Sequence, residues 1–248
     1  SNTALAEINN KYPYGGNNAA DNSGVMTYVS ICYAGARSTQ DIEHNGLTLN
    51  GVGNGTTIEN IYVLESADDA IEFFGGTVNV KNLLAVNPDD DMFDFTQGYC
   101  GTLSNCYGIW ESDYTSTEAD PRGIEADGNF DGLYPNHLRQ SDFVVDGMTI
   151  VNNAANTTDN VDRMQDVIKI RRGAKATIKN ALVKGTGGAI DLVDMNDGKG
   201  AGNAASTISI TNSLQLTGKK LNGEAVLNEA GSNTGADTSV FGWTKYNF

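Results

Sequence analysis

The chain has 248 residues, with 16 Lys or Arg against 31 Asp or Glu, so its formal net charge at pH 7 is −15. A surface that binds nucleic acid needs clustered cations, so this balance excludes nucleic acid as a partner and disfavours an anionic membrane surface. Hydrophobic residues make up 39% of the chain, enough for a sizeable core. The 29 Gly and 28 Asn residues are poor helix formers that favour turns, so we expect a β-rich fold.

Membrane-spanning segments and cysteine frameworks find no support in the sequence. No apolar run reaches the length of about 18 residues that a transmembrane helix needs, so we expect no transmembrane segment. Cys32, Cys100 and Cys106 form an odd set without a CxxC pair. We therefore predict free thiols rather than a disulfide framework or a zinc site.

Short segments with alternating apolar residues recur along the chain. They are residues 46–49, 70–73, 92–95, 123–126, 167–170 and 189–192. Their central apolar residues are 24, 22, 31, 44 and 22 positions apart, so a unit of about 22 residues repeats with insertions. The step of 44 residues fits either a hidden repeat unit or two loops.

A second apolar segment follows most of these, with one Asn, or once Gly, inside it. These segments are residues 57–63, 80–86, 103–109, 143–151, 178–183 and 210–214. Asn tolerates left-handed backbone angles, and its amide can hydrogen bond to the Asn one unit away, so we predict a bend with an Asn ladder. Each unit then contains three short strands that cannot bury their apolar faces alone, which is typical of a parallel β-solenoid.

Several segments, some of which contain the repeats above, resemble segments of a known family. They are residues 14–17 (Tyr-Gly-Gly-Asn), 20–24, 33–36, 45–49, 69–78, 90–99, 123–127 and 241–244 (Phe-Gly-Trp-Thr). With them the chain resembles right-handed parallel β-helix proteins of the pectin-lyase-like superfamily, and more closely the secreted or surface β-helix proteins of Bacteroidetes-type bacteria, many of unknown activity. The resemblance implies an all-β, single-stranded right-handed parallel β-helix outside the cell or on a bacterial surface.

The repeat also divides the chain. We expect an N-terminal extension or end cap over residues 1–24, the β-helix over residues 25–216 and a C-terminal cap over residues 217–248. An open solenoid end exposes unpaired backbone. We therefore expect either that residues 1–24 fold over the first coil or that the chain forms an end-to-end homo-oligomer.

Charged residues recur at the outward positions of the first strand in each unit. The predicted column consists of Thr48, Glu72, Asp94, Glu125, Lys169 and Asp191. A second column contains Asp127 and Arg171, and the preceding turn contains Asp69, Asp91, Arg122 and Asp166. Adjacent coils place such residues about 4.8 Å apart.

Two interpretations of these columns remain open. Because Arg122 and Lys169 stand among the acids, the columns can be a charge ladder that neutralises itself on a solvated sheet. Alternatively, the oxygen ligands of Asp69, Asp91, Glu72 and Asp94 form a candidate Ca²⁺ site, the only cofactor that we consider.

The longest insertions flank this sheet. They are residues 111–120, 128–140, 152–165 and 194–206. We call the face of this sheet that carries the charged columns the strip. Loops on both sides make the strip the floor of a groove, where aromatic rings, acids and amides could bind sugar. The expected ligand-binding residues are Glu72, Asp94, Asp127, Arg122, Trp110, Tyr114, Tyr134 and His137.

Catalysis is the alternative to binding. The resemblance implies polysaccharide lyases or hydrolases that work on this face, and a lyase base is often Lys or Arg in the superfamily. Lys169, Arg171 and Glu125 are then the candidate catalytic residues. We predict a carbohydrate-interacting protein that binds polysaccharide along this groove, with a Ca²⁺-assisted lyase or glycoside hydrolase and a non-catalytic adhesion module as alternatives.

Overall fold

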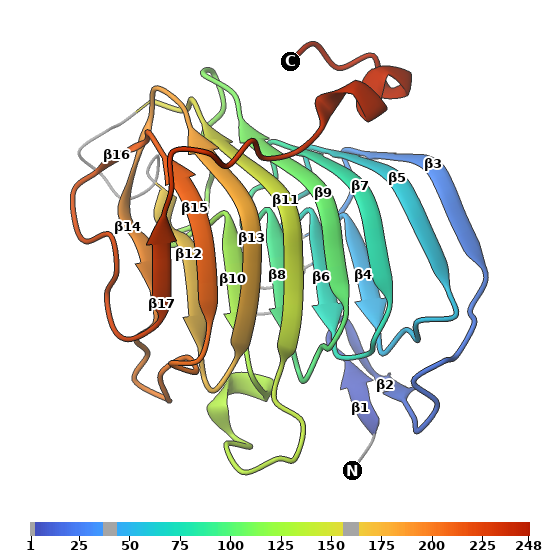
Figure 1. Ribbon diagram of the computed structural model, residues 1–248. Helices are drawn as coiled ribbons and strands as arrows, with labels where there is room; N and C mark the ends of the chain where they lie inside the picture. The colour runs from blue at the N-terminus through green and yellow to red at the C-terminus, as the bar shows by residue number, and fades with distance from the viewer. Residues whose placement is uncertain (1–2, 37–43, 156–163) are drawn as a thin grey trace.

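Two parallel β-sheets run the length of the protein in the computed structural model, which describes residues 3–36, 44–155 and 164–248 (Figure 1). The seven-stranded sheet contains β4 (Leu47–Asn50), β6 (Ile71–Phe74), β8 (Phe93–Thr96), β10 (Ile124–Asp127), β12 (Met164–Arg171), β14 (Gly188–Asp194) and β16 (Gln215–Leu216). The eight-stranded sheet contains β3 (Val25–Cys32), β5 (Thr57–Leu64), β7 (Asn79–Val86), β9 (Thr102–Trp110), β11 (Asp142–Asn152), β13 (Lys175–Lys184), β15 (Thr207–Asn212) and β17 (Val226–Glu229). The chain alternates between the sheets, so it is a right-handed parallel β-helix, as predicted.

The repeat of about 22 residues sets the pairing. Leu47 pairs with Ile71, Phe93 with Ile124 and Ile124 with Ile168, so equivalent positions of successive units stack. Since Ile124 and Ile168 are direct partners, the step of 44 residues contains no hidden coil. It consists of loops on either side of β11.

Asparagines mark the bend in the eight-stranded sheet. Asn60, Asn82 and Asn105 have φ values of 57°, 59° and 54°. The Asn82 amide donates to Asn60 Oδ1 at 2.9 Å, and the Asn105 amide donates to Asn82 Oδ1 at 2.9 Å. Strand pairing continues on both sides of the bend, so the two strands expected around each Asn form one bent strand.

The core lies between the sheets and contains stacked aromatic rings. The ring of Phe95 lies 5.1 Å from that of Phe73 and 4.2 Å from that of Phe143. Cys106 is buried among the core side chains, and all three cysteines are free thiols, as predicted. Among the described residues, no helix has the length and apolar character to cross a bilayer.

The N-terminal segment forms an antiparallel hairpin of β1 (Thr3–Ala6) and β2 (Asn9–Gly15). The Tyr14 hydroxyl donates to Gln97 Oε1 at 2.8 Å, and its ring lies 6.3 Å from that of Phe74. The hairpin therefore contacts the last residue of β6 and the turn that follows β8. Neither of its strands pairs with β3, which forms the edge of its sheet.

The C-terminal residues run back along the outside of the eight-stranded sheet (Figure 1). We call residues 230–248 the C-terminal strap; it contains the 3₁₀ helix η3 (Thr238–Thr244), while a shorter one, η1 (Phe130–Gly132), lies in the loop after β10. Phe241 of η3 is fully buried against the outer face of this sheet. Trp243 packs edge-on against Tyr28 of β3, with ring centroids 5.5 Å apart.

Candidate functional site

The predicted outward column lies on the outer face of the seven-stranded sheet. Glu72 pairs with Asp94, Asp94 with Glu125, and Glu125 with Lys169. Each is separated from the next by one strand spacing, about 4.8 Å. Glu72, Glu125 and Lys169 are no more than 9% exposed, so these outward side chains are largely buried rather than solvated.

The last position of the predicted column is wrong. Lys169 pairs with Asp194, whereas Asp191 pairs with Asp166. Ile190 therefore points outward and is half-buried instead of lying in the core. In β14 the apolar residues do not alternate strictly, so the pattern fitted two registers and the spacing of 22 residues selected the incorrect one.

The turn before these strands stacks acids around one arginine, as the spacing predicts. The backbone N–H of Asp91 donates to Asp69 Oδ1 at 2.9 Å. The Arg122 guanidinium lies 4.0 Å from Asp91 and 3.8 Å from Asp166. It also makes closer ion pairs with Glu125 at 2.8 Å and with Asp120 at 2.7 Å, and it is only 3% exposed.

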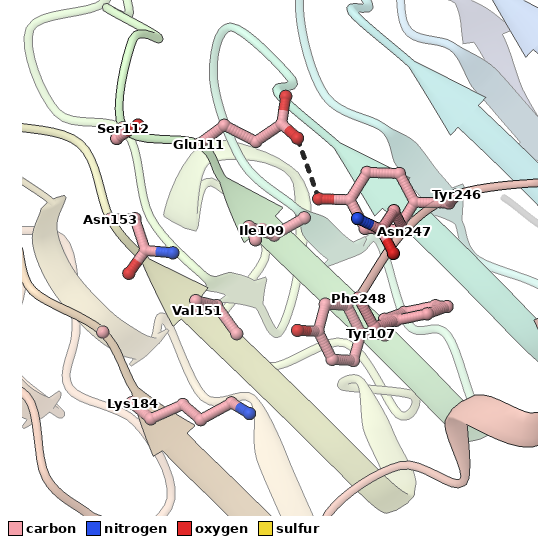
Figure 2. A pocket seen from close by; sticks show the side chains of 11 residues that line it. Tyr107, Ile109, Glu111, Ser112, Val151, Asn153, Lys184, Tyr246, Asn247 and Phe248 are labelled. Atoms are coloured by element: carbon pink, nitrogen blue, oxygen red, sulfur yellow. Dashed lines mark hydrogen bonds between the residues drawn. The ribbon is translucent and has the colours of Figure 1, made fainter.

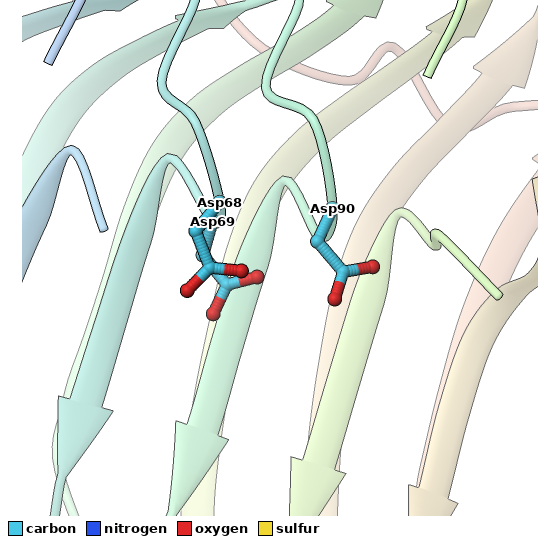
Figure 3. A group of neighbouring side chains, drawn as sticks. All are labelled: Asp68, Asp69 and Asp90. Carbon is cyan, nitrogen blue, oxygen red and sulfur yellow. The ribbon is translucent and has the colours of Figure 1, made fainter. Parts of the chain in front are cut away.

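At the N-terminal end of the strip, carboxylates alone line a cavity of about 190 Å³. We call it the acidic pocket; its lining residues are Glu7, Asp68, Asp69, Glu72, Asp90, Asp91, Asp94 and Glu125. Figure 3 shows Asp68 and Asp69 before β6 and Asp90 before β8, with their carboxylates close together. Carboxylate oxygens of Asp69, Glu72 and Asp94 also lie within 4.8 Å of one another.

Burial and mutual repulsion raise the pKa values of four acids in this pocket. Burial is the largest cause that raises the pKa of Asp69, Glu72, Asp91 and Asp94 well above their usual values. Neighbouring carboxylates add to it in each case. Among the described residues, the buried Oδ1 atoms of Asp91 and Asp94 have no hydrogen-bond partner. These two oxygen atoms can therefore accept a cation or a proton.

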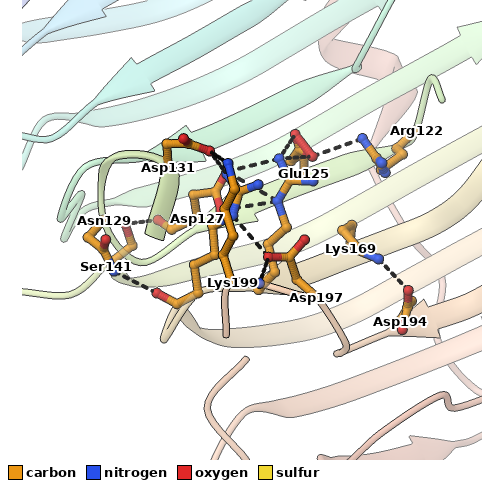
Figure 4. Close-up of polar contacts among 12 residues, drawn as sticks. Arg122, Glu125, Asp127, Asn129, Asp131, Ser141, Lys169, Asp194, Asp197 and Lys199 are labelled. Atoms are coloured by element: carbon orange, nitrogen blue, oxygen red, sulfur yellow. Dashed lines mark hydrogen bonds and ion pairs between the residues drawn. The ribbon is translucent and has the colours of Figure 1, made fainter. Parts of the chain in front are cut away.

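At the opposite end of the strip, bases neutralise the acids (Figure 4). Arg171 bonds Glu125 at 2.7 Å and Asp127 at 3.1 Å. Lys169 forms a short ion pair with Asp194 and lies 3.6 Å from Asp166. A second cluster of carboxylates, Asp166, Asp191 and Asp194, is therefore already paired with an ammonium group.

Further ion pairs, made by Arg172 and Lys199, tie two of the insertion loops to the sheet. Arg172 bonds Asp127 and Asp131 at 3.3 Å each and Asp197 at 3.2 Å. Lys199 pairs with Asp131, so the loops of residues 128–140 and 194–206 are linked at one end of the strip. Residues 156–163, most of the insertion expected over 152–165, lie outside the described residues.

The three candidate catalytic residues take part in this network. Lys169 and Arg171 each bond two carboxylates, and carboxylates raise the pKa of Arg171 further despite its burial. Glu125 accepts from both Arg122 and Arg171. A base that removes a proton needs an unprotonated form, which these ion pairs disfavour for Arg171.

The four residues expected to contact sugar in the loops have different positions. Trp110 is a core residue, 2% exposed, whose indole N–H donates to the Pro88 carbonyl at 2.9 Å, so its ring cannot contact a ligand in the groove. Tyr114 is half-buried and donates to Asp89 Oδ1 at 3.1 Å. Tyr134 and His137 are exposed on the loop of residues 128–140.

The sequence interpretation missed three members of the acidic pocket. Asp68 and Asp90 stand directly before Asp69 and Asp91, so the paired acids at a spacing of 22 residues were a signal for them. Glu7 comes from the turn of the N-terminal hairpin, and no repeat pattern indicates where that hairpin lies.

Comparison with known proteins identifies the family. The family model described as a pectate-lyase-like beta helix domain matches residues 1–245. Searches of curated proteins and of solved structures found no match. The range matched by the family model agrees with the extent of the parallel sheets and the repeated units along the chain. The chain therefore belongs to the pectate-lyase-like beta helix domain family.

Proposed function

We propose that the protein binds polysaccharide along the groove over the seven-stranded sheet, with Ca²⁺ held in the acidic pocket. The observation that carries this proposal is the division of the strip: its acids are paired with bases beyond β10, whereas carboxylates alone line the pocket beside β6 and β8. Family membership supports a carbohydrate ligand. A polysaccharide partner would place the protein outside the cell or on a bacterial surface.

The acidic pocket has the ligand chemistry that Ca²⁺ prefers. Asp69, Glu72 and Asp94 offer carboxylate oxygen atoms close to one another. The Oδ1 atoms of Asp91 and Asp94, which have no hydrogen-bond partner among the described residues, can also act as metal ligands. Ca²⁺ takes six to eight oxygen ligands, in flexible geometry. When bound, it would neutralise the acids and offer open coordination positions to carboxylate or hydroxyl groups of a sugar chain.

Exposed aromatic rings support a sugar ligand at the neighbouring end of the strip. Phe130 and Tyr134 are 52% and 56% exposed on the loop after β10. That loop is fixed to the sheet by the Arg172–Asp131 ion pair at 3.3 Å. Rings held near acids and amides can stack on the apolar face of a sugar while polar groups bond its edge.

Electrophoresis of the full chain through gels that contain uronic-acid or neutral polysaccharides tests this function. We expect retardation in at least one gel with Ca²⁺, and loss of that retardation with EDTA. Asp94→Asn removes a pocket charge and should weaken the affinity for the polysaccharide, measured from the retardation, about tenfold. The reason is that a charge-assisted contact contributes about 1.5–3 kcal/mol. Asp142→Asn is the control, since Asp142 is exposed in the other sheet.

Unchanged migration in every gel would contradict polysaccharide binding. Retardation that EDTA and Asp94→Asn leave intact would place the ligand elsewhere than beside the acidic pocket. The control variant should migrate like the unmodified chain in both conditions.

Hydrolysis is a second candidate, and one observation favours it. Glu72 and Asp94 are register neighbours, and burial raises the pKa of both, so one of them can stay protonated as a general acid. Reducing ends released from the retained polysaccharide, and lost with Glu72→Gln, would support turnover. A complete absence of both reducing ends and unsaturated products would leave binding as the function for the polysaccharides tested.

A further inference from the structure

A larger cavity, of about 380 Å³, lies on the other sheet (Figure 2). We call it the strap pocket, because the C-terminal strap forms one wall. Its lining residues are Tyr107, Ile109, Glu111, Ser112, Val151, Asn153, Lys184, Gly185, Tyr246, Asn247 and Phe248. Its volume falls in the range of about 300–1,000 Å³ that is usual for small-molecule sites.

The aromatic wall of this pocket is held by specific contacts. The Tyr246 hydroxyl donates to Glu111 Oε1 at 2.9 Å. The Phe248 ring packs edge-on against Tyr107, with centroids 4.9 Å apart, and also against Tyr246 at 5.1 Å. The rings of the strap thus have fixed positions relative to the sheet.

The floor is apolar. Ile109 and Val151 are register partners on β9 and β11, with exposed fractions of 7% and 4%. Tyr107 lies two residues before Ile109 on the same face. Such a floor, next to aromatic rings, suits the apolar face of a sugar ring.

The polar groups of the pocket are not equally available. Both carboxylate oxygens of Glu111 accept hydrogen bonds, one from Tyr246 and one from the Asn87 amide at 3.0 Å. Lys184, in contrast, makes no ion pair with any residue that the structure describes. Figure 2 shows the Lys184 ammonium directed toward the pocket from the side opposite Glu111.

An amide donor, Asn153, lines the same pocket, and Figure 2 shows Val151 between it and Lys184. Asn153 Oδ1 accepts from the backbone N–H of Thr186 at 3.1 Å, which leaves the NH₂ group of Asn153 to face the pocket. Val151 of β11 pairs with Lys184 of β13, and Asn153 directly follows β11. A cation and an NH₂ donor together are suited to a carboxylate.

We propose that the strap pocket binds a sugar unit that carries a carboxylate. The carboxylate bonds Lys184 and the Asn153 amide, and the ring lies on Ile109 and Val151 against the rings of Tyr107 and Phe248. This site is on the opposite sheet from the groove, so it gives the protein a second contact with an acidic polysaccharide and does not depend on Ca²⁺.

Titration of the full chain with monosaccharides in EDTA, followed by backbone amide NMR shifts, tests this proposal apart from the groove. Glucuronic and galacturonic acid are the probes, and glucose and galactose are the matched neutral sugars. We expect both acids to shift the amides of Ile109, Val151 and Lys184. Each neutral sugar should bind roughly tenfold more weakly, because it cannot use Lys184.

Variants sharpen the test. Lys184→Gln should weaken binding of the acids about tenfold and leave the neutral sugars unchanged, and Lys184→Arg should restore most of the loss. Lys179→Gln is the matched control, because Lys179 is an exposed lysine of the same strand outside the pocket. Its affinities should equal those of the unmodified chain.

Four results would overturn the proposal, the first three of which concern the pocket itself. These three are an absence of shifts at the pocket amides, equal affinity for acid and neutral sugars, and binding that Lys184→Gln leaves intact. Tighter binding of glucose 6-sulfate than of glucuronic acid would overturn the assignment to a carboxylate. Because EDTA removes Ca²⁺, failure of the groove proposal would leave these results unaffected.

Discussion

Single side chains decide where the strip on the seven-stranded sheet carries charge. Glu125 and Asp127 are buried acids, yet Arg122, Arg171 and Arg172 bond them closely. Asp69 and Glu72 are equally buried but have no basic partner in the ion pairs of the described residues. The difference between a structural network and a candidate cation site thus depends on three arginines and Lys169.

Arg122 should be essential for the stability of this network. Replacing Arg122 with Gln leaves Asp91, Glu125 and Asp166 without their shared cation, so we expect a loss of about 3 kcal/mol or more in the free energy of unfolding at neutral pH. Urea denaturation measures it. The control is Lys220→Gln, which removes an exposed pair with Glu229 and should cost about 0.5 kcal/mol. Equal losses in both variants would contradict the assigned role.

The acidic pocket predicts an unusual pH dependence. The pKa values of Asp69, Glu72, Asp91 and Asp94 are raised in the folded state, and burial raises the pKa of Asp166 to about 6. The folded state therefore holds protons that the unfolded state has lost above about pH 4, so stability falls as pH rises through the folded pKa values.

Thermal denaturation in EDTA between pH 5 and pH 8 measures this effect. We expect Tm to be higher at about pH 5 than at pH 8, and saturating Ca²⁺ to raise Tm mainly at the higher pH. A Tm that rises steadily with pH in EDTA would show that these carboxyls are ionised and stabilised in the folded state.

Residue burial was predictable only where the repeat determines it. Ile71, Phe73 and Phe95 are in the core because they alternate at the repeat spacing. Trp110 was interpreted as a loop residue, but it ends β9 and packs inward. Its position just before a long insertion gave no periodic signal, and a large apolar ring favours burial wherever the core has room.

Among the elements, the C-terminal strap couples distant coils. Thr234 N–H donates to Asn180 Oδ1 at 2.7 Å, and Asp237 N–H donates to Asn105 Oδ1 at 2.6 Å. Between them, Gly147 occupies the position of an Asn at φ 73°, and the Gly235 carbonyl oxygen lies 3.7 Å from where a Cβ would be. A Cβ at this position would be in ordinary van der Waals contact with the strap, so the strap crosses the bend close to Gly147.

Asn180 should hold the strap without supporting the solenoid. Among the described residues, its side chain bonds Thr234 and Gly235 of the strap and no others. Asn180→Gly should therefore expose the amides of residues 234–237 to faster hydrogen exchange by about tenfold. Gly preserves the left-handed backbone at this position.

Asn60→Gly is the matched variant. Asn60 bonds Asn82, and within the described part of the chain no hydrogen bond joins its side chain to the strap. Its exchange rates at residues 234–237 should match those of the unmodified chain. Equal acceleration in both variants would mean that the strap responds to the solenoid as a whole rather than to Asn180.

Element pairing followed from the sequence as far as the 22-residue period was unambiguous. It gave the partners of β4, β6, β8, β10 and β12, and it failed at β14, where Asp191 and Asp194 both follow apolar residues. The hairpin and the strap depend on contacts between segments that share no period, such as Tyr14 with Gln97. These could not be predicted from the repeat.

At the scale of the whole molecule, each of the two large sheets ends in two edge strands within the described residues. β3 and β17 are the end strands of the eight-stranded sheet, and Val25 and Tyr28 of β3 are 74% and 64% exposed. Parallel edges at opposite ends could pair between copies of the chain. End-to-end association therefore stays a prediction: light scattering after size exclusion should show a mass that increases with concentration, and a constant monomer mass would contradict it.

The central claim for the whole molecule is that the acidic pocket is a Ca²⁺ site within the groove. Calorimetric titration of the EDTA-treated and dialysed full chain with Ca²⁺ tests it most directly, with Asp94→Asn and Asp142→Asn compared under the same conditions. We predict saturable binding that Asp94→Asn weakens at least tenfold and Asp142→Asn leaves unchanged. No binding at millimolar Ca²⁺, or equal binding by both variants, would contradict the claim.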